Sequence, residues 1–247
     1  YLALFITSTV WGTTWVASKM AVAEVPALQM AGIRQFIAGI LFLGFFMLYK
    51  KLPLPTAKEF RWLFIMALLM FVLANGLSTW GVKFIPAGMA SLIGTLYPLS
   101  VVIIEAVFFR QRNFSILTIV GMFLGITGVG IVFYENAFHH TGSNYVAGLI
   151  LSVLAMLSWS FGTVFMARNK RPMNPYYATG WQMLLSSVML YLMAASTSPT
   201  LALTEVSLKA WGLIWYLVLF GSILTFVAFI YTMKKLPVAL ASLYAYI

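Results

Sequence analysis

Long apolar stretches, separated by short polar breaks, divide this chain into nine segments. Most are about 20 residues long, and a helix of that length, rising about 1.5 Å per residue, crosses roughly 30 Å of hydrocarbon. The segments are continuously apolar and about twice as long as a membrane-barrel strand, so the pattern predicts helices. The predicted spans are residues 2–22, 28–49, 62–82, 87–109, 116–134, 146–166, 176–196, 211–233 and 238–247.

Composition supports a membrane protein. Hydrophobic residues make up 62% of the chain and charged residues 8%, with a mean hydropathy of +0.97, far from the soluble range. The first segment lacks the basic start and cleavage site of a signal peptide, so we predict a true span. The ninth segment is only half a span long, so we expect a tenth span to follow. The absence of Cys excludes disulfides and Cys-ligated metals.

Basic residues fall on alternate connectors between the segments. One set of connectors carries eleven of the 15 Lys and Arg residues and the other carries two, Lys83 and Lys209. The positive-inside rule produces this alternation, so the basic connectors and the N-terminus are expected in the cytoplasm, with the chain in a cell membrane, preferably a bacterial inner membrane. The basic set is Lys50, Lys51, Lys58, Arg61, Arg110, Arg112, Arg168, Lys170, Arg171, Lys234 and Lys235.

The net charge of +10 therefore has a topological explanation. Because the charges lie in short loops beside apolar segments, we expect contact with anionic lipid of the bilayer and no nucleic-acid partner.

The sequence also repeats itself. Residues match at a separation of 148 positions, and residues 86–92 match 237–243 at a separation of 151. Five spans per half is an odd number, so the second half would be inverted in the membrane, as in many secondary transporters. Chance similarity between apolar helices is the alternative. The single-residue pairs are Trp11 with Trp159, Gly32 with Gly180, Arg34 with Gln182 and, at the second separation, Trp80 with Tyr231.

The predicted fold is an all-α polytopic membrane protein, a ten-helix bundle of two inverted five-helix repeats. Residues 1–134 would form the first repeat, and residues 146–247 the second, inverted and incomplete one. Small residues four positions apart, such as Gly121 and Gly125, permit close helix packing within a monomer or in a homodimer.

Several motifs resemble the EamA branch of the drug/metabolite transporter superfamily. They are VWGTTW at 10–15, AGIRQF at 31–36, IPAGMASL at 85–92 leading to Tyr97-Pro98, and the glycines Gly121, Gly125 and Gly128. The resemblance implies ten helices in two inverted halves, both termini in the cytoplasm, and export or exchange of small metabolites, frequently amino acids. Arg110-Gln111-Arg112 replaces the family's usual Gly-Glu-Arg-like turn, so no role of that acid is carried over.

Three charged residues lie inside predicted spans. Arg34 could hold a substrate carboxylate, pair with Glu24, snorkel to the headgroups or bind backbone carbonyls, because a charge at that depth needs a partner or water. Lys19 lies nearer the outer end, where snorkelling is the simpler interpretation. Glu105 is expected to pair with a cytoplasmic Arg rather than to relay protons.

Aromatic and small polar residues inside the spans are the candidate substrate-binding residues. In proteins that resemble this family, these spans line a central cavity, and an aromatic-lined cavity with few polar groups suits an amphipathic small molecule. Packing or an interfacial belt is the alternative for each aromatic taken singly. Pro98 is expected to break its helix. The candidates are Trp11, Thr14, Arg34, Asn75, Thr79, Trp80, Tyr97, Trp159, Tyr231 and Tyr244.

The sequence offers no chemistry for an enzyme. It contains no Asp, and its two His residues, His139 and His140, are adjacent in a predicted outer loop. No nucleophile–base pair, metal-ligand spacing or phosphate-binding loop is present, so no cofactor or metal is predicted.

We therefore predict a secondary transporter that exports or exchanges small metabolites by alternating access. Amino acids, preferably hydrophobic or aromatic ones, are the favoured substrates. Vitamins, nucleobases and nucleotide-linked sugars stay open, and a membrane-embedded enzyme or a non-transporting receptor are rivals of a different class.

Overall fold

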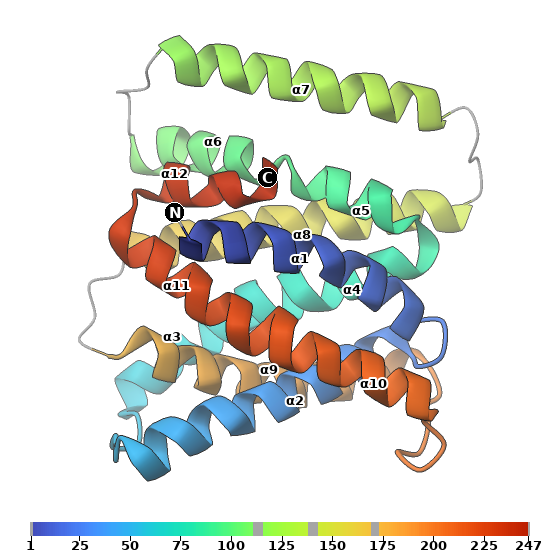
Figure 1. Ribbon diagram of the computed structural model, residues 1–247, viewed down its shortest axis with the longest axis vertical. Coiled ribbons are helices and arrows are strands. Elements are labelled where there is room, and N and C mark those ends of the chain that lie inside the picture. Colours follow the sequence, from blue (N-terminus) through green and yellow to red (C-terminus); the bar gives the residue numbers. More distant parts are fainter. Residues whose placement is uncertain (1, 111–115, 138–142, 169–172, 247) are drawn as a thin grey trace.

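The computed structural model describes residues 2–110, 116–137, 143–168 and 173–246, and these residues form helices and no strand (Figure 1). A helix covers each predicted span, with ends within a few residues of those expected. Predictions for some charged and polar loop residues lie outside the described residues: Gln111, Arg112, His139, His140, Lys170 and Arg171.

The described residues of the first half form seven α-helices. They are α1 (Leu2–Ala21), α2 (Ala27–Gly44), α3 (Ala57–Ala67), α4 (Leu77–Phe84), α5 (Ala87–Gly94), α6 (Tyr97–Phe109) and α7 (Ile116–Ala137). The second half contains α8 (Ser143–Arg168), α9 (Pro175–Thr197), α10 (Leu208–Tyr216), α11 (Thr225–Lys235) and α12 (Val238–Ala241). The π-helical segments are η1 (Phe45–Tyr49), η2 (Leu68–Gly76) and η3 (Leu217–Leu224), and η4 (Ser242–Tyr246) is a 3₁₀-helix.

Six helical stretches among the described residues are long and apolar enough to cross a membrane. They are Ala27–Tyr49, Ala57–Phe84, Ala87–Phe109, Asn144–Arg168, Pro175–Thr197 and Leu208–Lys235. A shorter apolar stretch, Val120–Ile131, lies in α7. The protein is thus a polytopic helical membrane protein.

Local sequence signals set where these helices begin. Pro26, Pro86 and Pro237 immediately precede α2, α5 and α12, where a missing N–H costs nothing. Thr56 and Glu59 form a reciprocal capping box at α3, so each satisfies a free backbone N–H of the first turn.

Two spans contain a π-helical segment near their middle, and one is broken. η2 separates α3 from α4, and η3 separates α10 from α11. α5 ends at Gly94 and α6 starts at Tyr97, so the break expected from Pro98 is present. Such irregular backbone inside a membrane span is tolerated where it lines a cavity or is buried in protein.

The helix bounds repeat at the separations found in the sequence. The span Ala27–Tyr49 and the span Pro175–Thr197 are 148 positions apart at both ends. The spans Ala57–Phe84 and Leu208–Lys235, which hold η2 and η3, are 151 positions apart at both ends.

Helices α2 and α9 cross at close range. A Cβ atom at Gly39 would lie 2.8 Å from the backbone nitrogen of Leu184 and 3.2 Å from the carbonyl oxygen of Gly180. Only glycine fits that crossing without a backbone shift.

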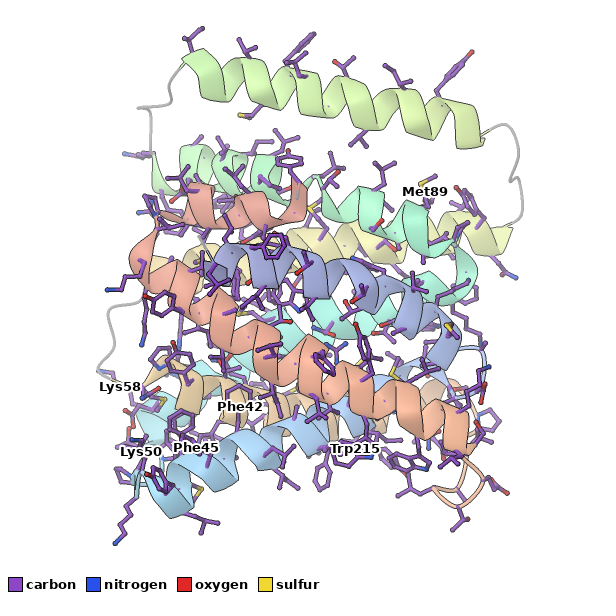
Figure 2. All side chains as sticks on the ribbon, in the orientation of Figure 1. Phe42, Phe45, Lys50, Lys58, Met89 and Trp215 are labelled. Atoms are coloured by element: carbon purple, nitrogen blue, oxygen red, sulfur yellow. The ribbon has the colours of Figure 1, made fainter. Side chains whose placement is uncertain are left out.

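The described connectors alternate between the two ends of the bundle (Figure 1). Connectors 22–26, 85–86 and 198–207 lie at one end, and 50–56 and 236–237 at the other. Lys50 and Lys58 lie at this second end (Figure 2). Helix α7 lies at the edge of the bundle (Figure 1).

Candidate functional site

A cavity of about 400 Å³, the large cavity, lies inside the bundle. Its walls come from α1, α2, the η2–α4 span, the broken α5–α6 span, α8 and η4. Ser18, Val82 and Gly88 belong to its lining, so it extends toward the end of the bundle where connectors 22–26 and 85–86 lie. The volume is that of a site for a small molecule.

Arg34 is the charged residue of the large cavity, and its side chain is held by two polar groups. The residue is 5% exposed. Its Nε donates to Ser222 Oγ at 2.9 Å and its Nη1 donates to Asn75 Oδ1 at 3.3 Å. A Cβ atom at Gly221 would lie 3.2 Å from Nη2, so the bare backbone of η3 makes room for the guanidinium.

The two irregular helices thus supply both partners of Arg34. Asn75 belongs to η2 and Ser222 to η3. π-helical turns often mark functional sites, because they offset side chains from the regular helical register. The structure does not show the snorkelling or the pairing with Glu24 that the sequence left open.

An aromatic cluster borders the large cavity. Trp11 and Trp159 meet edge to face at 5.4 Å between ring centroids, and Trp11 and Tyr244 at 4.9 Å. Trp11 Nε1 donates to the Gly221 carbonyl at 3.0 Å, and Trp159 Nε1 donates to Tyr244 Oη at 2.9 Å. Satisfied polar atoms fix the ring orientations, so the cavity offers preformed apolar faces.

Tyr97 extends this cluster to the broken span. Its hydroxyl donates to Thr163 Oγ1 at 3.1 Å, and its ring lies 5.4 Å from that of Tyr244. Behind the cluster, Phe226 and Phe229 of α11 are 2% and 1% exposed and contact Trp11. These rings fill the bundle on the far side of Trp11.

The structure brings eight of the ten sequence-predicted residues together in the lining of the large cavity. These are Trp11, Thr14, Arg34, Asn75, Thr79, Tyr97, Trp159 and Tyr244. Trp80 does not line it and packs against the hydrophobic core instead. Tyr231 does not line it either and is 52% exposed.

Sequence reasoning missed other residues of the site. Trp15 lies one helical turn from Trp11 and lines the same cavity, a position that the spacing of four residues could have indicated. Ser222, the partner of Arg34, is a lone hydroxyl in an apolar run and carries no comparable signal.

The other two charged residues inside the predicted spans, Lys19 and Glu105, have partners. Lys19 Nζ donates to the carbonyl oxygens of Val82, Lys83 and Ile85 at 2.8–3.0 Å, so it caps the end of α4. Glu105 pairs with Arg168 at 3.3 Å, which confirms the expected pairing with an Arg.

Glu24 ties the first connector to the start of α10. Its carboxylate accepts hydrogen bonds from Lys209, at 2.7 Å, and from the Ser207 hydroxyl. These donors, Lys209 first, lower the pKa of Glu24 below its ordinary value.

A second hollow of about 70 Å³, the small pocket, lies near the opposite end of the bundle. Gln182 lines it, is 4% exposed, and has no hydrogen-bond partner among the described residues. Thr179, which is 3% exposed, and Glu59 also line it. Gln182 is the residue that matches Arg34 at 148 positions.

No group of three His, Cys, Asp or Glu side chains that could hold a metal ion occurs in the described part of the chain.

A helical membrane bundle around a cavity of this size is typical of membrane transport proteins. The chain belongs to the EamA-like transporter family, whose sequence profile matches residues 1–134 and 146–247. It is 32% identical over 248 residues to the uncharacterized inner membrane transporter YedA of Escherichia coli (strain K12), covering 99% of this chain and 78% of YedA.

Two further comparisons agree. The chain is 27% identical to the uncharacterized transporter sll0355 of Synechocystis sp. over 238 residues. The match covers 91% of this chain and 72% of sll0355. A solved crystal structure of a protein matches with a TM-score of 0.72 at 18% identity, covering 99% of this chain and 82% of the other, which establishes a shared fold. The chain is therefore a membrane transporter of the EamA type.

Proposed function

We propose that this protein is a secondary transporter that exports or exchanges small metabolites, with hydrophobic or aromatic amino acids as favoured substrates. The observation that carries the proposal is the large cavity, whose lining combines one buried guanidinium with several aromatic rings. A mostly apolar site with a few fixed polar groups suits a small molecule with one charged end and one apolar end.

An inverted duplication is part of the proposal. The repeated helix bounds support it, and so does the contact between Trp11 and Trp159, because equivalent residues of two halves meet only near the axis that relates them. Helices α2 and α9 also match at a separation of 148 positions, and their close crossing is expected on the same axis.

The same symmetry suggests how access alternates. If the basic connectors face the cytoplasm, the large cavity opens outward and the small pocket lies on the cytoplasmic side. Rocking of the two halves about the α2–α9 crossing would close the first and widen the second. The N-terminus is cytoplasmic in this orientation.

Counterflow in proteoliposomes tests the function. Vesicles preloaded with one unlabelled compound are given the labelled one, over a panel of amino acids, vitamins and nucleobases. We expect accumulation with phenylalanine, tryptophan or leucine, and none in protein-free vesicles. Counterflow restricted to a vitamin or nucleobase would replace the substrate class, and no counterflow with any compound would contradict a carrier.

A further inference from the structure

Arg34 is a buried cation whose charge no acidic side chain in the large cavity balances. The residues that line this cavity include no Glu, and the chain has no Asp. The ion pairs Glu24–Lys209 and Glu105–Arg168 do not involve Arg34. A buried guanidinium without an acidic side chain beside it is costly, so the large cavity favours a negatively charged ligand.

The hydrogen bonds of Arg34 orient the group and leave donors free. Ser222 and Asn75 accept from Nε and Nη1, and Nη2 has no hydrogen-bond partner among the described residues. Both acceptors are neutral, so they fix the plane of the guanidinium without neutralising it. Because Arg34 lines the large cavity, the donors that Ser222 and Asn75 leave free are available to a ligand.

Lys19 shows by contrast what a structural cation looks like in this bundle. Its three donors all reach backbone carbonyl oxygens at the end of α4. Negative helix ends of this kind satisfy a cation without any ligand. Arg34 has no carbonyl partner among the described residues, so a purely structural role does not account for its free donors.

We propose that Arg34, held by Asn75 and Ser222, is a binding site for the carboxylate of the transported molecule. A planar guanidinium matches a carboxylate in shape as well as charge. The inference rests on the proposed transport function and specifies it: the substrate class is organic carboxylates with an apolar, preferably aromatic, body.

The rest of the cavity predicts which part of an amino acid matters. With no carboxylate in the lining, an ammonium group would meet ring faces, hydroxyl groups and the Asn75 amide, none of which carries a full negative charge. The site therefore requires the acid and tolerates the amine. An amino acid and a plain aromatic acid both satisfy this chemistry.

Three related probes separate these possibilities in the full-length purified chain. L-Phenylalanine carries both groups, 3-phenylpropionate only the acid and phenethylamine only the amine. Thermal unfolding in detergent measures binding at millimolar concentration, and competition against counterflow measures access to the transport site. We expect both acids to raise the unfolding temperature and to compete, and phenethylamine to do neither.

The ratio between the two acids identifies the source of the carboxylate. Equal affinities indicate a general organic-acid site, and a preference for L-phenylalanine indicates an amino-acid site. Binding of phenethylamine as tight as that of the acids would overturn the inference. So would the absence of any response to either acid.

Variants test the role of the guanidinium directly. Arg34→Gln introduces the residue found at the matching position 182, and we expect it to weaken binding of 3-phenylpropionate at least about tenfold. Arg34→Lys keeps the charge without the planar fork and should recover part of the loss. Lys83→Gln removes an exposed charge outside the cavity lining and should leave affinity unchanged.

Unchanged binding in Arg34→Gln would contradict the carboxylate site. If that variant does not fold, the three-probe series on the unaltered chain still decides. The two proposals fail separately: acid binding without counterflow would reject transport and leave the site, whereas counterflow of amines would reject the site and leave transport.

Discussion

The large cavity and the small pocket each border one member of the sequence-matched pair Arg34 and Gln182, yet they differ in volume and charge. Arg34 borders a cavity of about 400 Å³, and Gln182, 148 positions later, borders one of about 70 Å³. Both side chains are buried, at 5% and 4% exposure. Two positions that match in the sequence thus border hollows of very different volume.

The two hollows differ in two ways, in a volume that depends on conformation and in a side chain that depends on sequence. The unequal volumes are what an alternating-access carrier shows in any one state, because opening one side closes the other. The presence of Arg at position 34 and of Gln at position 182 is set by the sequence, so it stays the same in every conformation. If the proposed orientation is right, a carboxylate substrate meets a full charge on the outer side and a neutral amide on the inner side.

Truncating a side chain of the aromatic cluster that borders the large cavity should have the largest effect on stability and transport. Trp159 contacts Trp11, Phe226 and Phe229, so Trp159→Ala should cost about 3–5 kcal/mol of stability and reduce counterflow at least tenfold in the fraction that folds. Tyr231→Ala, on the exposed side of α11, is the control and should transport normally. Equal losses of counterflow in the two variants would show that the aromatic cluster has no specific role in transport.

The α2–α9 crossing is shared by both sites, and filling it should affect them together. Gly39→Ala places a methyl group against the α9 backbone, and overpacking of this kind costs about 1–3 kcal/mol. We expect a lower unfolding temperature in detergent. Gly44→Ala, where nothing lies within 4 Å, is the control. A Gly39→Ala protein as stable as the control would argue against a tight crossing.

Changing the small pocket should have a smaller and one-sided effect. Gln182→Leu removes an amide that forms no hydrogen bond with the described residues, so stability should change little. If substrate meets this amide in the inward state, binding measured from the cytoplasmic side should weaken by about 0.5–1.5 kcal/mol, or up to tenfold. Affinity from the outer side should be unchanged. An equal effect on both sides would contradict the separation of the two sites.

The smallest effect is expected at the end where the large cavity opens. Lys209 lowers the pKa of Glu24, so the pair stabilises the fold above the ordinary Glu pKa and loses this contribution as pH falls through the lowered pKa. Lys209→Gln should unfold slightly below the unaltered chain near about pH 7, and the gap should close in acid, below about pH 4. Lys209→Arg should behave as the unaltered chain does. A gap independent of pH would exclude the ion pair as its cause.

The sequence predicted the helices well because membrane spans are long and continuously apolar. Residues 87–109 were predicted with the bounds that the structure shows, and the break near Pro98 follows from its missing N–H. The repeat was visible because matching residues keep their order over both halves.

Side-chain placement was harder to predict around the irregular helices. Trp80 follows η2 and Tyr231 follows η3, and a π-helical segment shifts the faces of the helix beyond it. Thr79, next to Trp80, borders the cavity instead. Ser222 could not be foreseen because only the folded bundle brings it to Arg34, 188 positions away.

The central claim is that the large cavity and the small pocket open alternately on opposite sides of the membrane. The chain has no Cys, so Ser78→Cys in the cavity and Thr179→Cys in the pocket each create one target for a membrane-impermeant thiol reagent. We expect the first to react only from outside and the second only from the cytoplasmic side, with saturating substrate on one side raising one rate and lowering the other. Reaction of both from the same side, or rates that never change reciprocally, would contradict the account.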